Sequence, residues 1–160
     1  MATEMCVFVK KAKLPTVEQL QSAIEQEGFK YKLNDNFDIQ NNQFSFFMGS
    51  FEGLESGFDY ILEDYISQDW EFESQYAKKI ENYDGVAILG AFANAQEIVA
   101  MVIVSSMICK LSGGLMRSDF FFDGEFVDAN DAIGKAKSLI SNLREQFDGA
   151  STTRQAILDK

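Results

Sequence analysis

The sequence predicts a single α+β domain in which a mixed, mostly antiparallel sheet packs with about three helices. Segments with a period of two alternate irregularly with segments of helical period, which is typical of this class. The chain has 160 residues, of which 46% are hydrophobic and one is proline, so it can bury a core without metal or disulfide support. No internal repeat or linker divides the chain, so we expect one globular domain over 1–148 and a frayed, polar tail over 149–160.

The N-terminal part predicts a strand, a helix and a second, short strand. Residues 5–11 are rich in β-branched and aromatic side chains, as strands are. Thr16 and Gln19 have the spacing of a capping box, which predicts that a helix begins there. Gly28 is placed to end this helix as a left-handed residue, and residues 29–33 predict the short strand.

Two further strands are predicted over 43–50 and 57–66. The turn-like residues 52–56 join them, and an antiparallel hairpin is the simplest connection. In the second strand the even-numbered aromatic and aliphatic residues share one face. Asp59 and Glu63 therefore lie on the other face.

The centre of the fold is predicted from the apolar segments of the second half. Residues 86–92 are apolar on both faces and indicate a buried central strand, preceded by a short helix around 73–80. Asn94 and Glu97 repeat the capping-box spacing and begin a helix that runs to about Leu111. Because this helix is apolar nearly all round, we expect it to be buried.

The last third of the chain predicts two strands and a long helix. The strands span 115–122 and 125–127, and Asp123-Gly124 between them is a tight-turn signal. Asp128 is a natural N-cap for the final helix, whose apolar residues form one amphipathic stripe.

The net charge of −11 is concentrated in one stretch of the chain. Residues 1–32 have a net charge of +1 and residues 78–160 a net charge of −2, whereas 33–77 contain no Lys or Arg. The acids of that stretch are Asp35, Asp38, Glu52, Glu55, Asp59, Glu63, Asp64, Asp69, Glu71 and Glu73. A field of one sign attracts cations and repels phosphates and anionic lipids, so nucleic acids and membranes are disfavoured partners.

The residue types of most catalytic chemistry are missing from the sequence. It has no histidine, the commonest general base and metal ligand, and no glycine-rich phosphate loop. Cys6 and Cys109 stand alone in apolar runs and are predicted to be core residues. Glu63 and Asp64 are neighbours on a strand and point to opposite faces, which suits a two-carboxylate glycosidase poorly. We therefore predict no catalytic residue, no cofactor and no bound metal.

The N-terminal residues lack the basic region of a secretory signal, because Glu4 stands where that region requires positive charge. The longest apolar stretch, 98–109, is shorter than the roughly 20 residues of a membrane span. We therefore expect a cytoplasmic protein.

An acidic and aromatic surface remains, and it predicts protein binding. Residues 69–73 alternate acid and aromatic side chains, and protein interfaces favour Trp anchors surrounded by charge. The alternative is that Trp70 fills the core. The predicted partner-binding residues are Glu55, Asp59, Glu63, Asp64, Asp69, Trp70, Glu71 and Glu73.

Three segments together have the layout of a known class of small bacterial proteins. They are the opening 14–29, the central Glu55-Ser56-Gly57-Phe58-Asp59-Tyr60, and the helix-stop-strand unit 95–122. In this layout the chain resembles the immunity proteins of bacterial contact-dependent growth-inhibition and related polymorphic toxin systems. The resemblance covers most of the chain, consists of packing patterns, and carries over no site residues. It implies a basic toxin domain as partner, often a nuclease, that the chain binds tightly and inhibits.

Two alternatives stay open. The chain could be a structural or assembly subunit, including a homo-oligomeric module, whose charge only confers solubility. It could also be a carboxylate-metal enzyme in which Glu52, Glu55 and Asp59 gather a cation. An inhibitor is expected to present its acids as one contiguous surface with an exposed aromatic side chain, which separates it from the first alternative.

Overall fold

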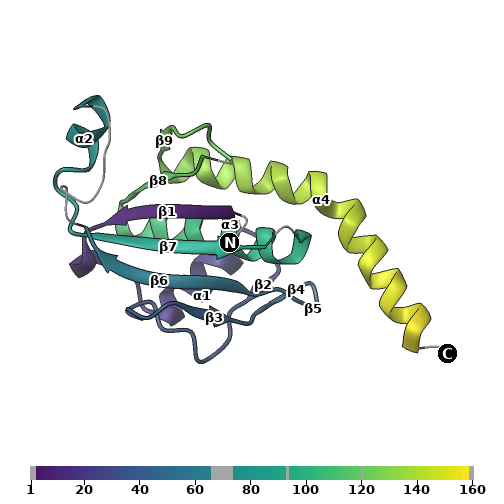
Figure 1. Ribbon diagram of the computed structural model, residues 1–160. Helices are drawn as coiled ribbons and strands as arrows, with labels where there is room; N and C mark the ends of the chain where they lie inside the picture. The colour runs from purple at the N-terminus through teal and green to yellow at the C-terminus, as the bar shows by residue number, and fades with distance from the viewer. Residues whose placement is uncertain (1–2, 66–73, 93, 120, 159–160) are drawn as a thin grey trace.

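The computed structural model describes residues 3–65, 74–92, 94–119 and 121–158, and it confirms the α+β class. A six-stranded antiparallel sheet with the order β3-β6-β7-β1-β8-β9 forms its centre (Figure 1). These strands are β1 (Thr3–Val9), β3 (Ser45–Phe47), β6 (Phe58–Asp64), β7 (Gly85–Ala91), β8 (Leu115–Arg117) and β9 (Phe126–Val127). A smaller sheet with the order β2-β4-β5 consists of β2 (Tyr31–Lys32), β4 (Ser50–Phe51) and β5 (Leu54–Glu55).

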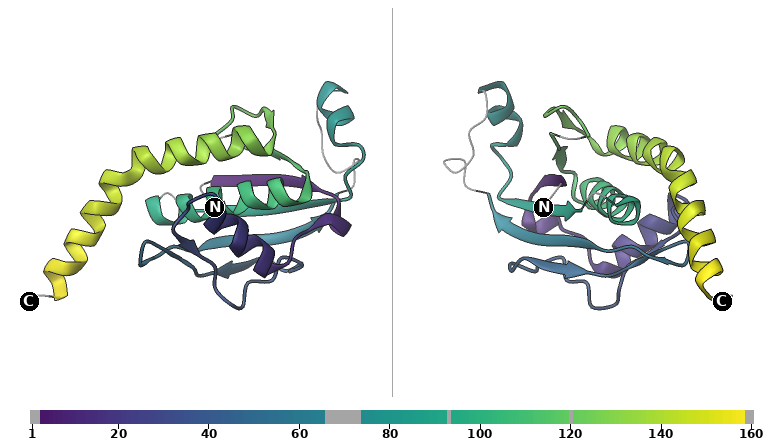
Figure 2. Two further views of the ribbon diagram at one scale, coloured as in Figure 1. Left: turned by 180° about the vertical axis from the view of Figure 1, so that it is seen from behind. Right: turned by 45° about the vertical axis from the view of Figure 1, so that its right-hand side comes forward.

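The longer helices lie on one side of the large sheet (Figure 2). α3 (Ala95–Ser112) packs directly on β1, β6 and β7, and it also contacts α1 (Val17–Gln26) and α4 (Ala129–Leu158). The short helix α2 (Ser74–Ile80) stands at one end of the sheet, and a 3-10 turn, η1 (Lys11–Lys13), follows β1. The sheet therefore has one face covered by helices and one face turned away from them.

The helix α3 is the centre of the core, as its apolar sequence predicts. All but a few of its residues are buried between the sheet and the other helices. By length and composition this helix could cross a membrane, but 72% of it is buried inside the molecule, as in a core helix. Asn94 caps its start by accepting a hydrogen bond from the amide of Glu97, and Gly113 ends it with a φ of 69°. The Glu97 carboxylate accepts from the amide of Phe92, so the reciprocal capping-box bond is absent here.

The hydrophobic alternation of β6 is confirmed. Its even-numbered residues from Phe58 to Leu62 are buried in the main core, whereas Asp59 and Glu63 point to the other face. β7 lies between β6 and β1 in the sheet, as predicted for a central strand. The capping box of Thr16 and Gln19 has both of its hydrogen bonds.

The predicted hairpin of 43–50 and 57–66 forms, with a smaller hairpin inside its connection. β3 pairs antiparallel with β6, and between them β4 and β5 pair through a two-residue turn. Glu52 and Gly53 have φ values of 50° and 84°, as both residues of such a turn require. This inner hairpin joins β2, so residues 29–33 contribute to the small sheet and not to the large one.

Several predicted segments differ in the structure. The strand expected over 5–11 spans Thr3–Val9, and the strand expected over 43–50 is divided, because β3 ends at Phe47 and Ser50 belongs to β4 of the small sheet. The strand expected over 115–122 ends at Arg117, because Ser118 begins a turn: its carbonyl accepts hydrogen bonds from the amides of Phe122 (3.0 Å) and Gly124 (3.2 Å). The segment from 149, expected to be a frayed tail, continues α4 as far as Leu158. Figure 1 shows this second half of α4 extending away from the sheet.

Candidate partner-binding face

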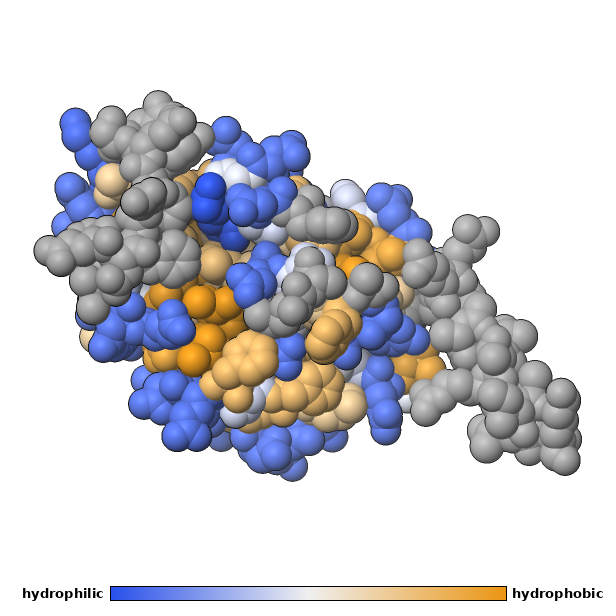
Figure 3. All heavy atoms as spheres, in the orientation of Figure 1, coloured by the Kyte–Doolittle hydropathy of each residue, from blue (hydrophilic) through white to orange (hydrophobic). Residues whose placement is uncertain are grey.

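The face of the large sheet that is turned away from α3 carries the candidate site. Strand alternation places every second residue of β1, β6 and β7 on it, and the strand register aligns these residues in rows. We call this surface the open face; it consists of Glu4, Cys6, Phe46, Asp59, Ile61, Glu63, Ile88 and Gly90, together with Phe92, which directly follows β7. Figure 3 views this side and shows apolar side chains gathered over β3, β6 and β7, bordered by hydrophilic ones.

Exposed apolar side chains are concentrated at the open face. Phe44, Phe46 and Met48 occupy alternate positions in and beside β3 and are 54%, 47% and 38% exposed. Phe92, just beyond β7, is 57% exposed. Among residues 3–65, 77–92, 94–119 and 121–144, Leu111 at the end of α3 is the one other large apolar residue that is this exposed. A contiguous exposed apolar surface of this kind is typical of an interaction site.

A glycine holds the ring of Phe46 on the open face. A Cβ atom at Gly57 would overlap this ring and would lie 2.9 Å from the carbonyl oxygen of Phe47. The ring therefore rests directly on the backbone of residue 57. Ile61 and Ile88, which are register partners on β6 and β7, are half-buried on the same face, two residues along their strands from the row of Phe46, Asp59 and Gly90. These side chains form one apolar surface across three strands.

The protein itself covers one end of this side of the sheet. Phe8 and Val86 are fully buried there, in a small cluster with Ile80 of α2. The Phe8 ring packs edge-on against Tyr65 and tilted against Phe126, with 5.5 Å between the ring centroids in each pair. The uncovered part of the sheet is therefore the part around residues 59 and 92.

Carboxylates dominate the charge of the open face. Glu4 and Glu63 are exposed, and Asp59 lies between Phe46 and Gly90 in its cross-strand row. The neighbouring cation is Arg117 of β8, whose guanidinium lies 3.5 Å from the carboxylate of Asp119. Because Asp119 compensates this arginine, the face as a whole is negative.

Burial raises the pKa of two groups on this surface. Asp59 is only 7% exposed, and desolvation, helped by the nearby Glu97 carboxylate, raises its pKa above the ordinary value of 3.8. Desolvation, helped by Glu4, raises the pKa of Cys6 to about 12. Cys6 is therefore a neutral thiol at physiological pH and contributes apolar surface instead of a nucleophile.

The structure brings together only part of the predicted binding residues. Asp59 and Glu63 share the open face. Asp64, at the end of β6, forms an ion pair with Lys11. Glu55 precedes Phe58, the first residue of β6. At 3.3 Å per residue, this end of β6 is about 20 Å from Asp64 at its other end. Asp69, Trp70, Glu71 and Glu73 lie outside the described residues.

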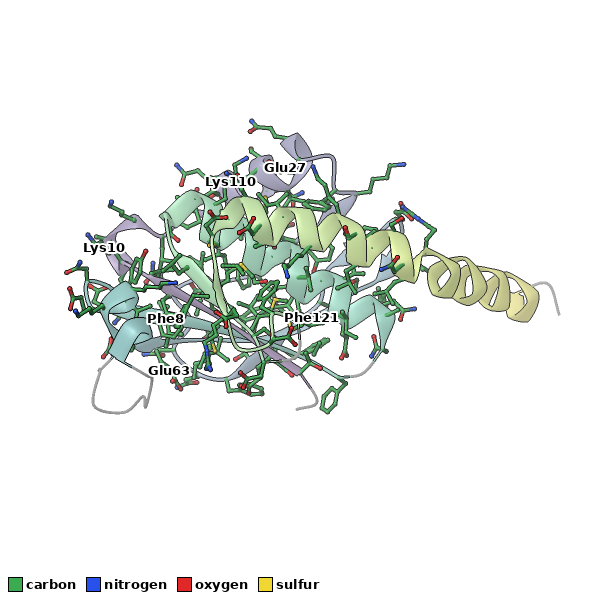
Figure 4. The ribbon with its side chains drawn as sticks, turned by 90° about the horizontal axis from the view of Figure 1, so that it is seen from above. Phe8, Lys10, Glu27, Glu63, Lys110 and Phe121 are labelled. Carbon is green, nitrogen blue, oxygen red and sulfur yellow. The ribbon has the colours of Figure 1, made fainter. Side chains whose placement is uncertain are left out.

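Another acid of the central stretch is neutralised on the helical side, where Glu52 forms an ion pair with Arg144 of α4. Glu27, which precedes the central stretch, is also neutralised on that side: it binds Lys110 at 2.7 Å and Lys137 at 3.2 Å, and these cations lower its pKa. Figure 4 shows Glu27 and Lys110 together on the side opposite Glu63. The expected single contiguous acidic surface is therefore wrong for the acids that the structure describes.

The cation site considered for Glu52, Glu55 and Asp59 is also not formed. Glu52 is held by Arg144, and Asp59 belongs to the other sheet. Over the ranges that the structure describes, no three Cys, Asp or Glu residues are grouped closely enough to hold a metal ion.

The strand patterns of the sequence do not predict the apolar anchors of the open face. Residues 43–50 and 86–92 are predicted as strands, but nothing in these patterns shows which face Phe46 and Phe92 occupy. One pattern in the sequence indicates an exposed row at Phe46. Residues 39–51 contain no charged residue, and Phe44, Phe46 and Met48 occupy alternate positions among them.

Comparison with known protein families, with curated proteins and with solved structures finds no match for this chain.

Proposed function

We propose that this chain is a non-catalytic binding protein that takes a cationic protein partner on its open face. The observation that carries the proposal is the presence of exposed aromatic side chains and exposed carboxylates on one uncovered sheet face. Phe46 and Phe92 supply anchors, and Glu4 and Glu63 supply charge at their border. This combination of aromatic anchors and peripheral charge is typical of protein interfaces.

The kind of partner follows from the charge of the face and of the whole chain. A net charge of −11 steers a basic protein toward the surface and repels nucleic acids. Inhibition of a basic toxin domain such as a nuclease, in the manner of an immunity protein, is the form of this proposal that we test. It rests on the open face alone, because Glu52 and Asp64 are paired with cations and do not extend the acidic surface.

The electrostatic part of the proposal is tested with a charge reversal. The partner is first captured from the native host and produced as a recombinant protein, and its association rate is measured at low salt. We expect Glu63→Lys to slow association about threefold or more. Glu25→Lys, an exposed acid on α1, is the matched control because it changes the net charge equally on the helical side. Equal effects of the two variants would show that the open face is not the contact.

The apolar part is tested with a truncation. Phe92→Ala is expected to weaken affinity about tenfold or more, as loss of an interface anchor does. Leu111→Ala removes the exposed apolar residue away from this face and should leave affinity unchanged. A growth assay completes the test: co-expression of the chain should relieve toxicity of the captured partner, and Phe92→Ala should relieve it less. Capture of no basic protein, or a partner with no toxicity, would contradict the inhibitor proposal.

A further inference from the structure

The strand β3 is an edge of the large sheet with hydrogen-bonding groups directed outward. Gly49 and Ser56 exchange two backbone hydrogen bonds (3.2 and 2.9 Å). This pair fixes which residue pairs of β3 and β6 are hydrogen-bonded and which are not. In the same register Phe46 lies opposite Asp59 in a non-hydrogen-bonded pair. The N–H and C=O groups of Phe46, and by alternation those of Phe44 and Met48, therefore point away from β6. No hydrogen bond within the described ranges engages them.

This edge is short, since β3 has three residues, but it lacks the charged residues and proline that protect many exposed edges. Such edges usually carry charged residues or proline, which discourage pairing with another strand. Residues 39–51 contain neither. The preceding chain does not pair with the edge either, because Phe37 and Ile39 are buried in the main core on the helical side. The unprotected edge thus coincides with three of the exposed apolar side chains.

The row of Phe44, Phe46 and Met48 along this edge is complementary to a second copy of itself. If two copies pair antiparallel about a two-fold axis at Phe46, this residue lies opposite its own copy, and Phe44 lies opposite Met48. Each of these pairs would exchange two backbone hydrogen bonds, since all three residues direct their N–H and C=O outward. On the open face every opposed pair is then apolar on both sides.

Charge does not oppose this pairing locally. The nearest carboxylate on the open face is Asp59, one strand inward from Phe46. In a paired edge the two Asp59 residues would be separated by three strand spacings, or about 14 Å. This exceeds the Debye length of about 10 Å at 0.1 M salt, so their repulsion is largely screened.

We propose that a second copy of this chain pairs with β3 to form a two-fold symmetric dimer with one continuous sheet. Phe44 and Phe46 are 54% and 47% exposed, and a whole aromatic side chain presents about 200 Å², so the two residues offer about 200 Å² per copy. Even with the backbone and Met48 added, the interface is small beside the roughly 1,200 Å² of stable complexes. The dimer is therefore weak and depends on concentration.

The dimer does not depend on the proposed partner. The effect of salt concentration distinguishes the dimer from the complex with that partner. Salt screens the repulsion between two chains of charge −11 and leaves apolar contacts in place, so it strengthens the dimer. Salt weakens the complex with a cationic partner. Glu63 and Phe92 lie away from the edge and stay accessible in the dimer, whereas Phe46 belongs to both surfaces.

The test is sedimentation of the purified protein from about 10 µM to about 500 µM, in low and high salt, with two variants at one position. Phe46→Ala removes the ring and keeps the N–H. Phe46→Pro also removes the outward N–H, and it leaves the β3–β6 hydrogen bonds intact because that N–H does not take part in them. We expect Phe46→Ala to weaken the dimer and Phe46→Pro to abolish it.

Amide hydrogen exchange of the wild-type protein gives a second measurement if the proline variant folds poorly. The amides of Phe44, Phe46 and Met48 should exchange more slowly as protein concentration rises, whereas the amide of Gly53 at a turn should not change. A monomer at all concentrations and salts overturns the proposal. A dimer that both variants weaken equally, or that leaves these three amides unprotected, overturns strand pairing as its basis.

Discussion

Replacing Gly57 by alanine tests how the aromatic ring of Phe46 is held on the open face. The new methyl group would overlap the Phe46 ring and lie 2.9 Å from the backbone carbonyl oxygen of Phe47. The ring can rotate away, but the carbonyl is fixed by the pairing of β3 with β6. The substitution therefore removes the ring from its position and strains the strand pair at the same time.

The size of the effect follows from two opposing contributions. Overpacking of this kind costs about 1–3 kcal/mol of stability. Alanine also reduces the conformational entropy of the unfolded chain relative to glycine, which stabilises the folded protein by about 0.4–1 kcal/mol. We expect Gly57→Ala to lower the free energy of unfolding by about 1–2 kcal/mol.

Urea unfolding measures this change, with a second glycine as control. At a typical m value of about 2 kcal/mol/M, the midpoint should fall by about 0.5–1 M. Gly134 lies in α4 with no atom within 4 Å of an added Cβ, so Gly134→Ala should raise stability by about 0.5–1 kcal/mol through helix propensity. If Gly57→Ala is as stable as the wild type while Gly134→Ala behaves as expected, the Phe46 ring does not rest on residue 57.

Three further predictions concern single side chains. Tyr60→Phe should lower the free energy of unfolding by about 1–3 kcal/mol in urea, because the buried hydroxyl donates to the carbonyl of Ile39 at 2.5 Å and that acceptor would lose its partner; an unchanged midpoint would contradict the bond. Ionised Asp59 costs stability above its raised pKa, and this cost vanishes below the ordinary value of 3.8, where the carboxyl is protonated in both states. Asp59→Asn should therefore stabilise the protein at pH 7 and lose this advantage near pH 3.5, and a gain that persists at low pH would rule out desolvation as its cause. With a pKa of about 12 in place of 9.0, the Cys6 thiol should react with iodoacetamide at pH 8 at least about thirtyfold more slowly than an ordinary thiol, because its smaller thiolate fraction outweighs the greater nucleophilicity of a more basic thiolate; rapid labelling of the native protein would show that it is not desolvated.

Local signals in the sequence predicted most of the elements correctly. The Thr16–Gln19 capping box, the Asn94 cap and the all-apolar helix after it are decided by residues within a few positions of one another. The same holds for the two faces of β6, since alternation alone separates Asp59 from its neighbours. The early end of β8 was missed because it depends on Ser118, whose carbonyl bonds amides four and six residues later.

The candidate site was less predictable, because the fate of each acid is decided by residues distant in the chain. Asp64 meets Lys11, and Glu52 meets Arg144, across separations that no local pattern contains. The exposure of Phe46 likewise depends on the edge position of β3, which is a property of strand order. Charge counted along the sequence therefore overestimated the acidic surface and overlooked the apolar one.

This redistribution of charge changes what kind of binding the face can support. If all the acids of the central stretch faced one way, affinity would come from many charge pairs and would fall steeply with salt. Among the described residues, the open face retains only Glu4, Asp59 and Glu63, and Asp59 is largely desolvated. Exposed pairs of this kind contribute at most about 1 kcal/mol each, whereas a buried aromatic anchor contributes about 2 kcal/mol or more. Charge on this face should therefore govern the rate at which a cationic partner arrives, and the rings of Phe46 and Phe92 should govern how long it stays.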